Sequence, residues 1–255
     1  MTSDKAFTDN TASLASEKEI LKSSAVSISS TETTETLVKG PSSFIPGHSL
    51  SIDARGKALI RLPTPASQLE IQIHNPDTSL AYVSTRKKRC SGNSTLSSPE
   101  RGDLISTEYF FGPNREPIVH LLNESEKESL QIKVKGKFTS RTTNFSSPDG
   151  SAFEWRYLKE RGLDGKKEQL LVLEKVEVTG RIRVAYLLRN EQTRSSKTSK
   201  RTAGNGGELV FDRHASELID EALIVATCLL MLKKEIDRRR ALQAFVLVAA
   251  AGSGS

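Results

Sequence analysis

Ala-Leu-Ile-Val-Ala-Thr-Cys-Leu-Leu-Met-Leu, residues 222 to 232, is the stretch that decides the fold of this chain. A helix formed by these residues has no polar side, so it must be buried all round. At ~1.5 Å per residue it is ~17 Å long, about half of the ~30 Å hydrocarbon layer of a membrane. Charged residues stand on both sides, at Asp220 and Glu221 before the stretch and at Lys233 after it. We therefore expect protein rather than lipid to surround this helix.

The sequence that precedes the helix predicts β-strands. Apolar and polar residues alternate in Leu69-Glu-Ile-Gln-Ile and again from Gln131 to Arg141, which is the period of a half-buried strand. Turn signals such as Asn75-Pro76-Asp77 and Asp149-Gly150 separate the segments. Roughly ten to twelve strands at this spacing indicate a sandwich or barrel. We expect a mainly β fold, a closed or nearly closed antiparallel β-barrel of about 12 strands wrapped around the C-terminal helix.

Composition divides the chain into three parts. Residues 1–43 are dominated by Ser, Thr, Glu and Lys, and such a segment buries too little apolar surface to offset its ordering entropy, so we expect a disordered N-terminal arm. Residues 44–240 form the barrel domain, with the helix over about 214–240 and with Asp212 or His214 as its cap. Residues 241–255 are an apolar run followed by a Gly/Ser tail, which we leave unassigned.

Charge and cysteine content favour an intracellular protein with anionic partners. The formal net charge is +6 on 255 residues, which tilts the choice of partner toward anionic groups. Only two cysteines are present, and no disulfide framework is indicated, so we expect a reducing compartment. The first residues lack the basic and apolar regions of a secretory signal. We predict a location in the cytoplasm, at a membrane surface or in the nucleus, and no secretion.

Several segments together resemble one superfamily. They are Tyr109-Phe110-Phe111-Gly112-Pro113, Phe153-Glu154-Trp155-Arg156, Val184-Ala185-Tyr186, Gly207-Glu208-Leu209-Val210-Phe211 and the apolar helix from Leu218 to Leu232 with its following basic residues. In this order of elements the chain resembles the tubby C-terminal-like superfamily, and most nearly its fungal branch of uncharacterised tubby-like domains. Other branches are the phospholipid scramblases and the plant LURP-one-related proteins. The resemblance covers about residues 44–240 and implies a twelve-stranded barrel threaded by a hydrophobic helix. It implies little about activity.

The sequence contains no pattern typical of catalysis. Its four histidines, at positions 48, 74, 120 and 214, are scattered and lack a metal-binding spacing. There is no nucleophile elbow and no phosphate-binding glycine loop, and Gly204-Asn-Gly-Gly is better interpreted as a flexible linker. Glu154 and Arg156 flank Trp155 and favour a cross-strand surface pair over a catalytic dyad. We expect that this chain is not an enzyme and that it has no cofactor, metal site or small-molecule substrate.

Basic side chains form rows and clusters that are candidates for anion binding. Strand alternation places three lysine amines on one face about 6.6–7 Å apart, a spacing able to contact adjacent anionic groups. The alternative is a solvated outer face that discourages edge aggregation. The candidate residues are the row Lys133, Lys135 and Lys137, the shorter row Arg181 and Arg183, and the cluster Arg86, Lys87, Lys88 and Arg89.

A second loop cluster extends from Arg194 to Arg201, where serines and threonines lie among the charges. Such clusters are typical of attraction to acidic membranes, of nuclear import or of ordinary solvated loops, and phosphorylation there would cancel charge. Aromatic residues make up 5% of the chain and sit on apolar strand faces, so specific nucleic-acid recognition is not expected.

Three functions follow as hypotheses. The first is a non-enzymatic binding module for anionic phospholipid head groups or an acidic protein partner. The second is a structural or protein-interaction domain whose charges serve solubility alone. The third, by analogy, is a membrane-associated scramblase-like protein.

Overall fold

A computed structural model describes residues 44–57, 68–88, 91–110, 112, 115–122, 130–136, 141–161, 165, 167–199 and 201–252, with the backbone alone for 247–252. All of them belong to one compact unit, Lys39–Ser255. The expected disordered arm, residues 1–43, lies outside the described residues, as do Lys137 and Arg89.

Most of the described chain is β-strand. The strands are β1 (Pro46–Ile52), β2 (Arg55–Lys57), β3 (Glu70–His74), β4 (Leu80–Thr85), β5 (Ser94–Ser98), β6 (Gly102–Glu108), β7 (Ile118–Leu121), β8 (Leu130–Lys133), β9 (Thr143–Ser146), β10 (Ala152–Arg161), β11 (Lys167–Glu177), β12 (Gly180–Leu188), β13 (Ala203–Asn205) and β14 (Glu208–Asp212). Twelve of them form one antiparallel sheet in the order β8-β7-β6-β5-β4-β3-β1-β14-β12-β11-β10-β9, and β2 pairs with β13.

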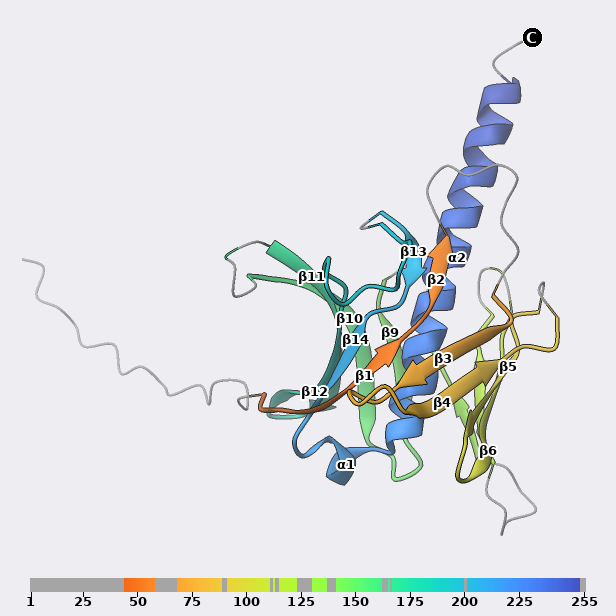
Figure 1. Cartoon of the computed structure of the whole chain (residues 1–255). Helices are drawn as coiled ribbons and strands as arrows, with labels where there is room; N and C mark the ends of the chain where they lie inside the picture. The colour runs from red at the N-terminus through yellow and green to blue at the C-terminus, as the bar shows by residue number, and fades with distance from the viewer. Residues whose placement is uncertain are drawn as a thin grey trace, which may run out of the picture. The chain divides into compact units, whose positions relative to one another are not determined.

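The twelve-stranded sheet is nearly closed into a barrel (Figure 1). Its two edge strands, β8 and β9, meet at one bridge just beyond β8. There the amide of Lys135 donates to the carbonyl of Asn144 at 2.7 Å, and the amide of Asn144 donates back at 2.8 Å. The predicted mainly β, nearly closed barrel is confirmed.

A short helix and a long one follow the last strand. The short helix α1 (Ala215–Leu218) ends at Ile219, whose backbone is extended (φ −165°, ψ 147°), and the long helix α2 (Glu221–Gly252) then begins. The carboxylate of Asp220 accepts a hydrogen bond from the amide of Leu223 at 3.2 Å, so Asp220 caps α2. The long helix therefore begins about seven residues later than the sequence pattern predicts. Asp212 instead accepts from the amide of His214 in the preceding turn.

The barrel is filled by the first half of α2. Each residue from Ala222 to Leu232 is at most 7% exposed. These residues join one apolar core with the inward-facing side chains of the strands, including Trp155. The one polar residue of the stretch, Thr227, accepts a hydrogen bond from the indole N–H of Trp155 at 3.0 Å and donates to the carbonyl of Leu223 at 2.8 Å. The prediction that protein surrounds this stretch is confirmed.

Beyond Leu232 the same helix continues past the basic residues and through the run that the sequence left unassigned, as far as Gly252 (Figure 1). Among the described residues, no helix has the length and apolar character needed to cross a membrane.

Candidate functional site

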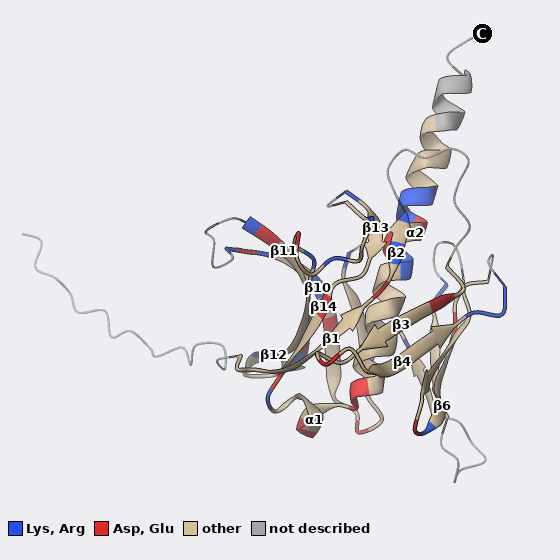
Figure 2. Ribbon diagram, viewed as in Figure 1, with Lys and Arg blue, Asp and Glu red and all other residues tan. Residues whose placement is uncertain are grey.

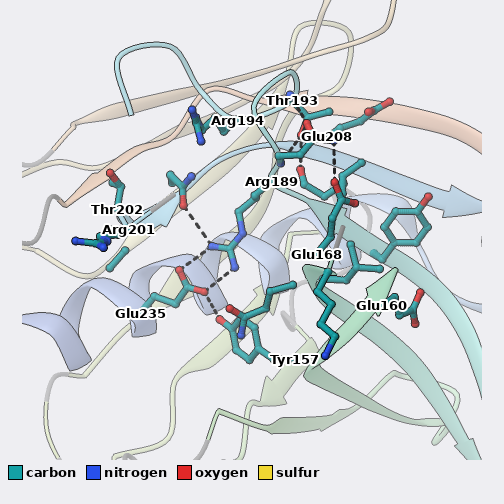
Figure 3. A pocket seen from close by; sticks show the side chains of 18 of the residues that line it. Tyr157, Glu160, Glu168, Arg189, Thr193, Arg194, Arg201, Thr202, Glu208 and Glu235 are labelled. Atoms are coloured by element: carbon teal, nitrogen blue, oxygen red, sulfur yellow. Dashed lines mark hydrogen bonds and ion pairs between the residues drawn. The ribbon is translucent and has the colours of Figure 1, made fainter. Parts of the chain in front are cut away.

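A groove of about 1330 Å³ lies beside α2 (Figure 3). Its walls come from β10, β11 and β12, from the loop of residues 189–202, and from α2 between Glu235 and Leu242. Among the described residues that line it, nine are basic and five are acidic. The basic ones are Arg141, Arg161, Lys167, Arg183, Arg189, Arg194, Arg201, Arg238 and Arg239, and the acidic ones are Glu160, Glu168, Glu191, Glu208 and Glu235.

Glu235 forms the floor of this basic groove. Its carboxylate accepts two hydrogen bonds from the guanidinium of Arg189, at 2.8 and 3.0 Å, and one from the amide of Gly204 at 2.7 Å. It also accepts from the hydroxyl of Tyr157 on β10, as Figure 3 shows. The side chains of Arg189 and Glu235 are only 11% and 13% exposed. One buried ion pair therefore ties α2 to β10, to the residue after β12 and to β13.

The electrostatics of the floor keep this pair ionised. Burial would raise the pKa of Glu235, but the charge of Arg189 and the hydrogen bonds outweigh burial and lower it. Burial, together with the nearby carboxylate of Glu235, raises the pKa of Tyr157. Burial would lower the pKa of Arg189, but the charge and hydrogen bonds of Glu235 outweigh burial, so the pKa of Arg189 is raised. The charges of Arg189 and Glu235 therefore cancel, and the electrostatic potential in the groove is set by the other charged side chains that line it.

The loop that forms one wall is held by its own hydrogen bonds. The side-chain oxygen of Asn190 accepts from the amides of Gln192 and Thr193 at 2.9 and 3.0 Å, as in an Asx turn. The buried hydroxyl of Ser195 donates to the carbonyl of Ile52 on β1 at 3.0 Å. These bonds fix the backbone on both sides of Arg194, so its guanidinium is presented from an ordered segment.

The interpretation of Gly204-Asn-Gly-Gly as a flexible linker is wrong. Residues 203–207 are buried, and three of them form β13 against α2. Gly204 has φ +69°, and a Cβ there would lie 2.5 Å from the carbonyl oxygen of Leu232. At Gly206 a Cβ would lie 1.9 Å from the carbonyl oxygen of Ile52. These glycines allow two backbones to approach closely, a reason that composition alone does not reveal.

Two arginines that line the groove lie in different settings. Arg141 lies over the ring of Tyr157, 5.8 Å from its centroid. Arg239 donates from one guanidinium nitrogen to the carbonyl of Arg201 at 3.2 Å. The other terminal nitrogen of Arg239 is buried and has no hydrogen-bond partner within the described part of the chain.

The two arginines of the row on β12 are both paired with glutamates. Arg183 lines the groove and forms an ion pair with Glu160. Arg181 lies on the outer face, where it contacts Glu154 and Glu174. Glu174 also binds Arg156 at 2.7 Å, so the predicted cross-strand pairing of the residues that flank Trp155 is confirmed.

The other predicted residues lie apart from the groove. Lys133 and Lys135 are exposed, and Ile132 and Val134 between them are buried, as the alternation predicts, but neither lysine lines the groove. Arg86 is half-buried and lines a second cavity of about 50 Å³ together with Lys57, Lys233 and Arg240, and Lys87 and Lys88 are exposed. The structure therefore does not unite the predicted rows into one site.

Sequence reasoning named the groove arginines only in part. The loop cluster that ends at Arg201 and the basic run at Arg238 were visible as local concentrations of charge. Arg189 and Glu235 gave no such signal. Arg189 follows an apolar strand, Glu235 lies among other charged residues after Lys234, and their partnership depends on a separation of 46 residues.

The cysteine that the structure describes is Cys228, which lies within α2. Cys228 is fully buried in the helix, and burial raises the pKa of its thiol to about 12. No cluster of three metal-ligating side chains occurs in the parts of the chain that the structure describes.

No protein-family model, curated protein or solved structure matches the chain. The tubby-like resemblance therefore stays a prediction, and the fold class, a nearly closed twelve-stranded barrel filled by a helix, is what the structure defines.

Proposed function

We propose that this protein is a non-enzymatic binding module whose basic groove holds an anionic, phosphorylated head group. The observation that supports this most is the excess of basic over acidic side chains, nine against five, around a single cavity. A concave surface lined by one sign of charge concentrates ligands of the opposite sign.

The excess of basic side chains stays the same when two internal ion pairs are set aside, and the ratio of basic to acidic side chains rises. Arg183 with Glu160 and Arg189 with Glu235 neutralise each other. Seven basic and three acidic side chains then remain among the described lining residues. Six of these seven are arginines, whose planar guanidinium donates two parallel hydrogen bonds to a phosphate. This composition favours a ligand with several phosphate oxygens.

The size of the groove agrees with such a ligand. Its volume of about 1330 Å³ exceeds the ~300–1,000 Å³ of ordinary small-molecule pockets. This volume sets no steric limit on a phosphorylated inositol ring. An acidic peptide segment is the other ligand of this charge, and the experiment below separates the two.

The test is calorimetric titration with a soluble inositol polyphosphate. We expect binding that weakens as salt is raised, because exposed charges are screened. The double substitution Arg194→Glu and Arg201→Glu should weaken it at least ~tenfold, since charge-assisted hydrogen bonds contribute ~1.5–3 kcal/mol each. The control is Arg101→Glu with Arg213→Glu, which reverses the same charge at exposed arginines outside the groove. Equal affinity of the two double variants would refute the assignment of the groove.

The lysine row supplies a second comparison. Lys133→Glu with Lys135→Glu should leave titration unchanged, because neither residue lines the groove. Loss of binding in this variant alone would place the site on the outer face beyond β8. Binding of an acidic peptide without binding of the inositol polyphosphate would overturn the head-group proposal in favour of a protein partner.

A further inference from the structure

The second half of α2 exposes an apolar surface. Leu242, Phe245 and Val246 are 59%, 72% and 58% exposed, whereas every residue from Ala222 to Leu232 in the same helix is at most 7% exposed. Positions 242, 245 and 246 are spaced i, i+3 and i+4, so the three side chains lie on one side of the helix. A cluster of large exposed apolar side chains on one helix face marks a site of interaction.

Basic side chains adjoin this apolar tip, which we define as residues 241–252. Arg238 and Arg239 stand one turn before Leu242, and all three line the basic groove. Figure 2 shows the blue basic segments of α2 where the helix passes the strands, followed by a stretch without charge. The groove and the apolar tip are therefore parts of one continuous surface, basic at its base and apolar at its end.

We infer that the apolar tip of α2 inserts into an anionic lipid bilayer, with Arg238, Arg239 and the basic groove at the level of the head groups. Affinity of an amphipathic element for a membrane combines burial of apolar area with attraction to anionic lipid, and both components are present on this surface. The inference deepens the proposed function, because it assigns the phosphorylated group of the groove to a lipid.

The length of the tip fits insertion into a single leaflet. Its twelve residues, 241 to 252, span ~18 Å as helix. The hydrocarbon core is ~30 Å thick, so the tip reaches about half-way into it. The protein then binds the membrane from one side.

Charge favours a membrane over a second copy of the chain as the occupant. A self-associated pair would bring two sets of the same arginines to one interface, where like charges repel. An anionic bilayer instead neutralises them while it covers the leucine, the phenylalanine and the valine.

The test is flotation of the whole chain with vesicles of phosphatidylcholine, alone or mixed with phosphatidylserine. We expect recovery with the mixed vesicles and little with phosphatidylcholine alone. Replacing Leu242, Phe245 and Val246 together by Gln, a good helix former, should lower the vesicle partition coefficient at least ~tenfold, because three large apolar side chains, each more than half exposed, are lost. Undiminished recovery of this triple variant would overturn the inference.

A matched pair of single variants controls for a general loss of apolar surface. Val246→Gln and Val178→Gln make the same change at two exposed valines, but Val178 lies in the turn between β11 and β12. Only Val246→Gln should reduce vesicle binding. An equal effect of the two would count against the tip.

Insertion itself has a direct optical readout. Trp155, the single tryptophan, is fully buried, so its emission reports the core alone. A Phe245→Trp variant adds a second indole at the tip, whose emission should shift to the blue with mixed vesicles and be quenched by brominated acyl chains. Emission that remains that of a solvated indole, although the protein floats, would refute insertion.

These results separate the inference from the proposed function. The double variant Phe245→Gln, Val246→Gln should bind a soluble inositol polyphosphate as the unaltered chain does, because neither residue lines the groove. Loss of this soluble binding only in the Arg194→Glu, Arg201→Glu variant would support the groove whatever the tip does. Dimerisation of the unaltered chain in sedimentation, abolished in the triple variant and unaffected by vesicles, would assign the tip to a second copy and overturn the membrane inference.

Discussion

Replacing Glu235 by Gln should destabilise the barrel far more than an ordinary surface substitution does. The change keeps the shape of the side chain but removes the charge that pairs with Arg189. Arg189, with a side chain 11% exposed, would remain buried and charged without a carboxylate. Its desolvation would then be uncompensated.

The expected magnitude follows from this burial. Removing one partner of a buried ion pair costs ~3–5 kcal/mol. We expect about 3 kcal/mol in the free energy of unfolding, the lower end, because the glutamine oxygen still accepts a hydrogen bond. The control Glu160→Gln breaks the more exposed pair with Arg183, of which the carboxylate side chain is 38% exposed, and should cost ~1 kcal/mol or less.

The assay is urea denaturation near neutral pH, followed by circular dichroism. The two variants and the unaltered chain should share one m-value, so that midpoints convert directly to differences in free energy. A Glu235→Gln chain within ~1 kcal/mol of the unaltered one would show that the ion pair of the groove floor does not hold α2 in place.

Three further predictions concern the same architecture. Since the ion pair lowers the pKa of Glu235 despite burial, its stabilisation is complete above the unfolded pKa of ~4.3 and is lost as pH falls through the folded pKa. The difference in stability between the unaltered chain and Glu235→Gln, measured by urea denaturation, should therefore shrink in acid, and a constant difference would contradict the assignment. Leu229→Asp should abolish cooperative melting, because an unpaired buried charge costs several kcal/mol, whereas Phe245→Asp should melt normally; similar melting of both would argue against burial. Gly204→Ala should lower the melting temperature by several degrees, because its Cβ would meet the carbonyl of Leu232 at a positive φ, and an unchanged temperature would show that α2 and β13 are not closely packed.

The barrel and its filling could be predicted from the sequence because both leave periodic signals. Alternation on either side of Lys133 places Ile132 and Val134 in the core, and an uninterrupted apolar stretch leaves a helix no solvent face. The start of the helix could not be predicted as well. Ile219 fits the apolar pattern of the helix, but its backbone is extended, so it separates α1 from α2. The residue that caps α2 is Asp220 rather than Asp212 or His214.

The groove could not be predicted because it depends on contacts between residues distant in sequence. Tyr157 lies on a strand, Arg189 directly after another strand and Glu235 on a helix, and no spacing between them is repeated or local. The glycines of residues 204–207 have the composition of a linker, and only the approach of α2 shows their role in close packing. Charge rows were visible, but the sequence did not show that Arg181 and Arg183 pair with glutamates on neighbouring strands.

The reactivity of Cys228 tests the central claim, that the barrel encloses the first half of α2. In a Cys90→Ser chain, Cys228 is the remaining thiol, at the middle of the enclosed stretch and fully buried. In the folded Cys90→Ser chain, Cys228 should react with a thiol reagent at least on the order of a hundredfold more slowly than the cysteine of a Cys90→Ser, Cys228→Ser chain that carries Leu242→Cys. Denaturant should abolish the difference. Equal rates for the two thiols in the native state would show that the helix lies outside the barrel.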